Sequence, residues 1–83
     1  MEQLQTIAVP PEVLDRWQAV AGKLGVHGIG LRFELGRIGS GESSRYMLGR
    51  AAKAARIAED ATDGELSVLA ADVAAEIEDA ADR

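Results

Sequence analysis

Apolar and polar residues alternate along the segment 28–36. The apolar positions are Ile29, Leu31, Phe33 and Leu35, and the positions between them are glycine or charged. An apolar residue at every second position is typical of a strand that buries one face. We therefore predict a central strand over residues 29–35, with all four apolar side chains turned toward the core. The glycine-rich segment 36–41 would end this strand.

A short strand is also predicted over residues 3–9, because this segment is rich in β-compatible residues and stops at Pro10. Pro11 favours the start of a helix. Apolar residues then recur at spacings of three and four, which predicts an amphipathic helix that ends near Gly25. These apolar positions are Val13, Leu14, Trp17, Val20, Ala21 and Leu24. Trp17, in the middle of this apolar face, is the expected anchor of the core.

Helical periodicity returns in the second half of the chain. One helix is predicted from about Glu42 to Asp60, capped by Ser40 or Ser43. The apolar face of this helix comprises Met47, Leu48, Ala51, Ala54, Ala55 and Ala58. The turn residues 62–64 separate it from a second helix whose apolar positions are Leu66, Leu69, Ala70, Val73, Ile77, Ala80 and Ala81. Because the connection is short, these two helices should form an antiparallel hairpin.

These elements predict a mostly helical α+β fold: a short strand, an amphipathic helix, a central strand and a C-terminal antiparallel helical hairpin. We expect one small domain over residues 1–83, with a strand–helix–strand unit at 1–38 and the hairpin at 41–82. The two strands would pair in parallel through a right-handed crossover, or pair across a dimer axis. A chain this short buries only about 60% of its unfolded surface. Since it has no cysteine to form a disulfide, we expect a homodimer.

Charge is unevenly distributed along the chain. The formal net charge is −5, but residues 28–57 carry +4 and residues 58–83 carry −8. This layout disfavours nucleic-acid binding by the whole protein and leaves room for a local basic patch.

The residue types needed for catalysis or metal binding are sparse. His27 is the single histidine, and no set of ligands clusters around it in the sequence. The sequence indicates no nucleophile with a base, so we expect no catalytic residues, no metal and no cofactor. The lack of cysteine is compatible with the cytoplasm, where we expect the protein, and no apolar segment is long enough to span a membrane.

Two charged surfaces are candidates for binding. The predicted last helix carries the exposed acids Glu65, Asp72, Glu76 and Asp79, which could dock on a basic surface of another protein or could simply keep the protein soluble. The predicted helix before it carries the basic residues Arg45, Arg50, Lys53 and Arg56. These could contact phosphates or an acidic partner, or could be a solvated face that the acidic helix partly neutralises.

The start of the chain, from Thr6 through Pro10-Pro11-Glu12 to Gly25, resembles the opening of ribbon-helix-helix proteins of the Arc repressor type. The resemblance covers about the first 25 residues. It implies that the first strand pairs antiparallel with that of a second subunit and enters the DNA major groove. Of the matching outward positions, Leu4, Thr6 and Ala8, Thr6 alone could hydrogen-bond to a base. The predicted strand at 29–35 departs from the family, which has a second helix there; if these residues were helical, the ribbon-helix-helix architecture would be favoured.

We therefore expect a small non-enzymatic regulator that binds another protein through its acidic helix. An inhibitor or an antitoxin fits this description, since small acidic antitoxins often join a ribbon-helix-helix module to a toxin-binding segment. The first alternative is a homodimeric DNA-binding repressor that uses Thr6 and the basic residues at 45–56. The second alternative is a structural assembly subunit.

Overall fold

A computed structural model describes residues 6–39 and 42–83. Its elements are the strand β1 (Thr6–Ala8), the helix α1 (Pro11–Lys23), a 3₁₀ helix (Gly25–Gly28), the helix α2 (Ile29–Ile38), the strand β2 (Glu42–Ser44) and the helices α3 (Arg45–Asp60) and α4 (Gly64–Ala81). The mostly helical α+β class and the C-terminal helical hairpin are thus confirmed. Leu4 and Ser40, named above as a strand position and a candidate cap, lie outside the described residues.

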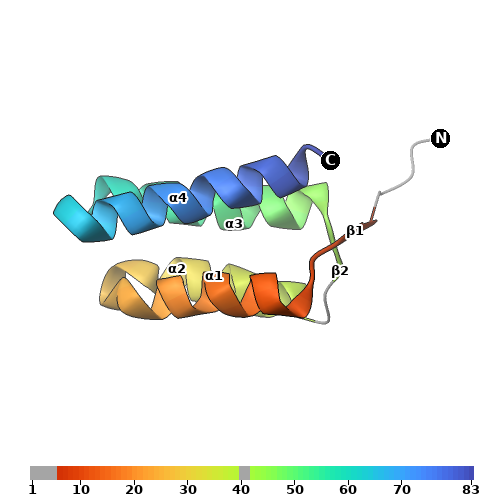
Figure 1. Ribbon diagram of the computed structural model, residues 1–83, viewed down its shortest axis with the longest axis horizontal. Helices are drawn as coiled ribbons and strands as arrows, with labels where there is room; N and C mark the ends of the chain where they lie inside the picture. The colour runs from red at the N-terminus through yellow and green to blue at the C-terminus, as the bar shows by residue number, and fades with distance from the viewer. Residues whose placement is uncertain (1–5, 40–41) are drawn as a thin grey trace.

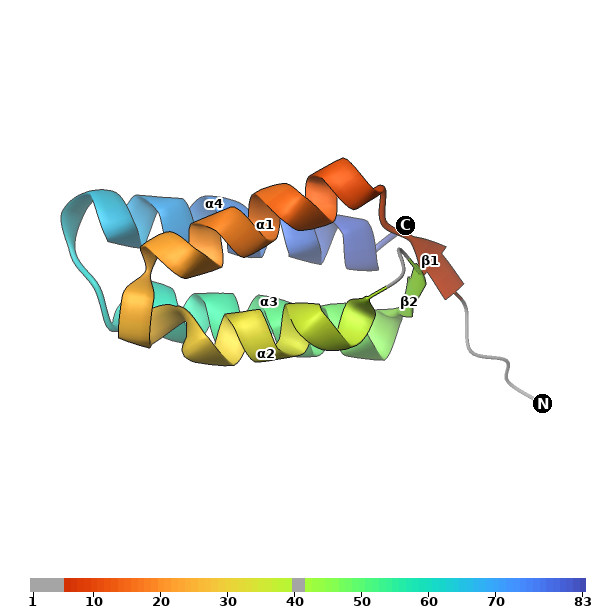
Figure 2. The same ribbon diagram turned by 90° about the horizontal axis from the view of Figure 1, so that it is seen from below.

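The four helices pack as an antiparallel bundle (Figures 1 and 2). Each helix contacts the helices before and after it, and α4 closes the ring by packing against α1. The two strands form an antiparallel ribbon at the end of the bundle where α1 begins and α4 ends. This arrangement brings the first and last helices side by side, although α2 and α3 lie between them in the sequence.

The predicted central strand is wrong, because residues 29–38 form the helix α2. Leu31, Leu35 and Ile38 recur at helical spacing and are buried, with at most 3% of their surface exposed. Ile29 and Phe33, which the alternating pattern placed in the core, are instead 61% and 63% exposed. The helix satisfies the backbone hydrogen bonds of this segment internally, whereas a strand here would need a neighbouring strand.

The pairing of the strands also differs from the prediction. Residues 42–44 were expected to begin a helix, but they form β2, which pairs antiparallel with β1 so that Thr6 lies opposite Ser44. The side chain of Ser44, a residue with extended backbone, caps α3 by accepting a hydrogen bond from the Met47 amide at 3.2 Å. Ser44 therefore serves both elements, because the N-cap of α3 and the strand β2 both require an extended backbone at this residue. Ser43, within β2, is buried and donates a hydrogen bond to the backbone oxygen of Ser44 rather than acting as the cap.

The helices themselves follow from familiar sequence signals. Pro11 occupies the first turn of α1, and Gly25, with a φ of +61°, follows its end in the left-handed conformation that glycine adopts without strain. Gly28 allows the next turn to pack against α1, since a Cβ there would collide with the carbonyl oxygen of Ala21. Trp17 is 1% exposed and is the largest side chain of the core, as predicted. The core between α3 and α4 is rich in alanine, which lets these two helices approach closely.

Candidate protein-binding surface

The four acidic residues predicted to bind a partner all project from the same side of α4. Glu65, Asp72, Glu76 and Asp79 are separated by seven, four and three residues, which places them along one stripe of an α-helix. All four are exposed. The buried positions of the helix, such as Val73 and Ile77, lie on its other side. The structure therefore brings the predicted acids together as one surface, which we call the acidic stripe.

An apolar residue interrupts the acidic stripe. Val68 is 59% exposed and lies between Glu65 and Asp72 at the same helical spacing. Continuing this spacing gives Ala75, which is also exposed, and then Asp79. Steps of three and four residues are those of a helix face that packs along another helix. Val68 was not singled out from the sequence, and it is not among the apolar positions predicted for the core of this helix.

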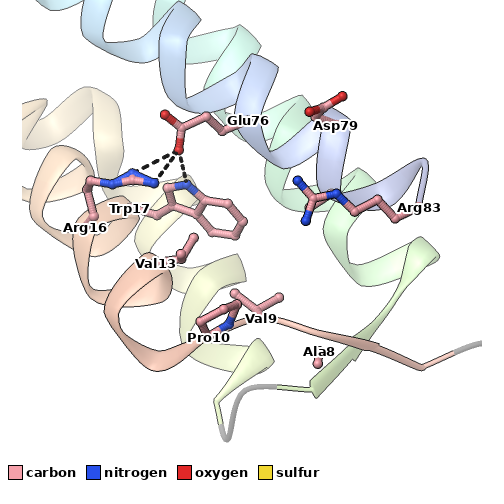
Figure 3. A pocket seen from close by; sticks show the side chains of 10 residues that line it. Ala8, Val9, Pro10, Val13, Arg16, Trp17, Glu76, Asp79 and Arg83 are labelled. Carbon is pink, nitrogen blue, oxygen red and sulfur yellow. Dashed lines mark hydrogen bonds and ion pairs between the residues drawn. The ribbon is translucent and has the colours of Figure 1, made fainter.

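Glu76 differs from the other acids because it is held by contacts within the protein (Figure 3). Its Oε1 accepts a hydrogen bond from the indole Nε1 of Trp17 at 2.9 Å and forms an ion pair with Arg16 at 2.9 Å. Since the indole is buried, this carboxylate satisfies a donor that would otherwise be costly to leave without a partner. Glu76 thus joins α4 to α1, a role that the sequence did not indicate.

A pocket of about 260 Å³ lies beside Glu76, between the end of β1, α1 and the last turn of α4 (Figure 3). Val9, Val13 and Ala80 provide apolar walls, while Asp79 and Arg83 provide charged groups at its edge. The acidic stripe therefore ends next to a small hollow with both apolar and charged lining. Such a hollow can receive a side chain of a partner that binds along α4.

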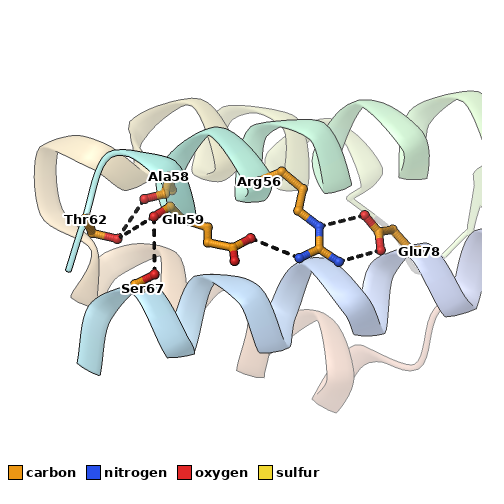
Figure 4. A network of polar contacts seen from close by, with 6 residues as sticks. All are labelled: Arg56, Ala58, Glu59, Thr62, Ser67 and Glu78. Atoms are coloured by element: carbon orange, nitrogen blue, oxygen red, sulfur yellow. Dashed lines mark hydrogen bonds and ion pairs between the residues drawn. The ribbon is translucent and has the colours of Figure 1, made fainter. Parts of the chain in front are cut away.

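The basic residues of α3 are largely engaged within the protein. Arg56 donates to both carboxylate oxygens of Glu78 on α4, at 2.8 and 2.9 Å, and to Glu59 at 2.9 Å (Figure 4). The hydrogen bonds with Glu78 and then Glu59 raise the pKa of Arg56, and the hydrogen bond from Arg56 lowers the pKa of Glu78. Figure 4 also shows Thr62 and Ser67 donating to backbone carbonyls at the turn of the hairpin. This network fixes α4 against α3.

The other basic residues have separate surroundings. Arg50 forms an ion pair with Glu34 of α2 at 3.0 Å, and the hydrogen bond between them raises the pKa of Arg50. Arg45 donates to the backbone oxygen of Ala81 at the end of α4, at 2.9 Å. Lys53 is exposed and forms no ion pair with any residue in the described ranges. The neutralisation of this helix face by the acidic last helix, one of the two interpretations of the sequence, is thus observed for Arg56 through Glu78, whereas Arg50 is neutralised by Glu34 of α2.

Thr6, the remaining candidate, is exposed on the ribbon opposite Ser44, next to the start of α3 at Arg45. Among residues 6–39 and 42–83, no three His, Cys, Asp or Glu side chains are grouped so that they could hold a metal ion. None of the helices in these ranges combines the length and the apolar character needed to cross a membrane. What the described surface offers chemically is a row of carboxylates that can accept hydrogen bonds from lysine or arginine.

Comparisons of the chain with protein-family models, with curated proteins and with solved structures found no match.

Proposed function

We propose that this protein is a small non-enzymatic regulator that binds another protein through the acidic stripe of α4, in the manner of an inhibitor or antitoxin. The observation that carries the proposal is the grouping of Glu65, Asp72 and Asp79 on one exposed helix face. Within the described residues, none of these three carboxylates has an ion-pair partner. They are therefore available to a partner, whereas Glu76 is engaged by Arg16 and Trp17.

The partner that suits this surface is a protein with a basic face, in particular a basic helix. Carboxylates spaced along the helix attract lysine and arginine, which accelerates association and selects against acidic surfaces. Val68, in the middle of the stripe, supplies an apolar contact from which water can be excluded. Asp72 and Asp79 are the main binding residues in this proposal, and Glu65 supports them. Glu76 positions α4 against α1.

The experiment compares two double variants with the same change in charge. D72K/D79K reverses the stripe, and D15K/D60K reverses two exposed acids on α1 and α3; both bring the formal net charge from −5 to −1. Each tagged protein captures partners from a lysate of the source organism, and the partner held by the wild type is then titrated by calorimetry. We expect D72K/D79K to bind at least ten-fold more weakly, with a smaller dependence on salt, and D15K/D60K to bind like the wild type.

Two results would contradict the proposal. If D72K/D79K, shown by circular dichroism to be folded, binds the partner as the wild type does, the acidic stripe is not the contact surface. If both double variants lose binding equally, the effect is one of net charge and not of this helix face.

A DNA-binding repressor is the second candidate, and the helical state of residues 29–38 favours it. The order strand–helix–helix, which is that of the ribbon-helix-helix resemblance, occurs in β1, α1 and α2 and again in β2, α3 and α4. The antiparallel ribbon that this family forms between subunits would here lie within one chain. The ion pairs of Arg50 and Arg56, and the acidic Glu42 on the ribbon, weigh against this candidate.

The repressor hypothesis is tested by DNA binding at several salt concentrations. A repressor would bind less tightly as salt rises, and K53Q would weaken binding because Lys53 is exposed and outside the ion pairs of the described chain. Binding that is undetectable at low salt, even at high protein concentration, would eliminate this candidate.

A further inference from the structure

A second surface, formed by α2 and α3, exposes large apolar side chains. Ile29 and Phe33 of α2 are 61% and 63% exposed, and Ile57 of α3 is 60% exposed. Soluble proteins seldom leave apolar groups of this size gathered on one face unless the face contacts another molecule. The alternating pattern of residues 28–36 hid this surface, because it placed Ile29 and Phe33 in the core.

A groove runs along this face between α2 and α3. It has a volume of about 350 Å³ and is lined by Gly30, Glu34, Arg50, Lys53, Ala54 and Ile57. Its floor is formed by small residues, since a Cβ on Gly30 would lie 3.9 Å from that of Ala54. Phe33 is one helical turn from Gly30, which lines the groove, and Ile57 is one turn from Ala54 and lines the groove itself, so each helix carries an exposed apolar side chain at or next to the groove.

The charges around the groove are mainly positive. Glu34 and Arg50 neutralise each other across it, at 3.0 Å. Lys53 has no ion pair with the described residues, and the guanidinium of Arg37 lies over the ring of Phe33 at 6.0 Å from its centroid. A twofold contact between two copies through this face would bring these uncompensated cations close to their own counterparts, which is unfavourable. An acidic partner would instead compensate them.

We propose that the α2–α3 groove binds an amphipathic helix of a partner protein, whose apolar residues recur every three or four positions and are flanked by aspartate or glutamate. Two antiparallel helices with small residues between them form a straight groove that a third helix can enter, and the apolar residues of the ligand helix would contact Phe33 and Ile57. Its acidic residues would meet Lys53 and Arg37. This surface is separate from the acidic stripe and opposite to it in charge, so the two proposals stand independently.

Selection from a phage-displayed library of helical peptides with randomised surface positions tests this proposal without a known ligand. The bait is the full chain, and F33S, I57S and K53E are the test variants. A19S is the control, because Ala19 is an exposed apolar residue of α1 that belongs to neither proposed binding surface. Fluorescence of Trp17 and circular dichroism verify that each variant is folded.

We expect the recovered peptides to carry acidic residues beside a helical apolar stripe. By fluorescence anisotropy, they should bind F33S, I57S and K53E at least ten-fold more weakly than the wild type, and bind A19S like the wild type. Recovery of no binding peptide, or recovery only of peptides that bind F33S and the wild type equally, would overturn the proposal. Sedimentation that shows a dimer lost in F33S but kept in A19S would also overturn it, because a second copy would then occupy the groove.

Discussion

Trp17 and Glu76 show how a single hydrogen bond can connect the core to the surface. The indole ring of Trp17 is buried, yet its N–H donates a hydrogen bond to the carboxylate of Glu76, which is about half exposed. The same carboxylate oxygen forms an ion pair with Arg16. Removal of the carboxylate leaves a buried donor without a partner, whereas loss of its charge alone affects an ion pair that solvent already screens. These two effects can be separated by substitution.

We predict that E76A destabilises the protein by about 1–3 kcal/mol, because the Trp17 N–H loses its acceptor. E76Q retains an amide oxygen that can accept this hydrogen bond, so it should cost about 1 kcal/mol or less. Urea unfolding followed by fluorescence of Trp17, the single tryptophan, measures both. Equal losses in E76A and E76Q would mean that the ion pair with Arg16, and not the indole, accounts for the role of Glu76.

Two glycines should respond in opposite directions to the same substitution. At Gly28 a Cβ would meet the carbonyl oxygen of Ala21 and lie 2.9 Å from the Cβ of Leu24, so G28A should destabilise the protein by roughly 1–3 kcal/mol. At Gly49, inside α3, a Cβ would meet no atom within 4 Å, so G49A should stabilise it by about 0.5–1 kcal/mol. Thermal unfolding measures both changes. A neutral G28A would show that the 3₁₀ turn does not pack closely on α1.

Among the helices, α2 is the one that the pattern of apolar residues did not predict. The other three helices span thirteen to eighteen residues, over which helical periodicity is distinct, and they were predicted. In the ten residues of α2, Leu31 and Leu35 fit both an alternating pattern and a helical one. Ile29 and Phe33 favoured the prediction of a strand, because a strand would bury both residues whereas a helix exposes them. An exposed phenylalanine is not an expected feature of an isolated soluble domain.

The helical state of α2 makes a sharp prediction about two of its residues. In a strand with one buried face, Phe33 and Leu35 would point the same way and both would be costly to truncate. In the helix, F33A should change the stability by no more than about 0.5 kcal/mol, because Phe33 is on the surface. L35A should cost about 2–5 kcal/mol, because Leu35 is fully buried. Urea unfolding measures the loss of stability in both variants. Losses of similar size in F33A and L35A would indicate that residues 29–35 form a strand.

The acidic stripe was predictable in part. The positions of Glu65, Asp72 and Asp79 on one face follow from their spacing once the helix is recognised. The engagement of Glu76 by Arg16 does not, because the two residues are sixty positions apart and meet only through the closure of the bundle. Val68 was not singled out, because it falls outside the apolar face predicted for this helix and a single exposed valine does not by itself indicate a binding surface.

At the scale of the whole molecule, ion pairs connect every helix to another. Arg16 joins α1 to α4, Arg50 joins α3 to α2, and Arg56 joins α3 to α4.

A homodimer, expected from the small size of the core, stays a prediction. The need for a second copy to pair the strands is removed, since β1 and β2 pair with each other. Sedimentation equilibrium at micromolar concentrations measures the oligomeric state directly.

The ion pair between Arg56 and Glu78 predicts how the stability of the folded protein changes with acid. Hydrogen bonds from Arg56 lower the pKa of Glu78 in the folded protein below its usual value of 4.5, so folding favours the ionised carboxylate. This contribution to stability is present above pH 4.5 and is lost as the pH falls through the lowered pKa. In E78Q the contribution is absent at every pH.

We therefore expect the free energy of unfolding to fall more steeply below pH 4.5 in the wild type than in E78Q, with E78Q already less stable at pH 7. E65Q is the matched control, because Glu65 is exposed on the same helix and lacks an ion pair with the described residues. Its stability should follow that of the wild type at each pH. Urea unfolding between pH 3 and pH 7 measures all three proteins. If E78Q and the wild type lost stability in parallel, the bidentate contact between Arg56 and Glu78 would not persist in solution, and the attachment of α4 to α3 would depend on apolar packing and on the hydrogen bonds of Arg45 and Ser67.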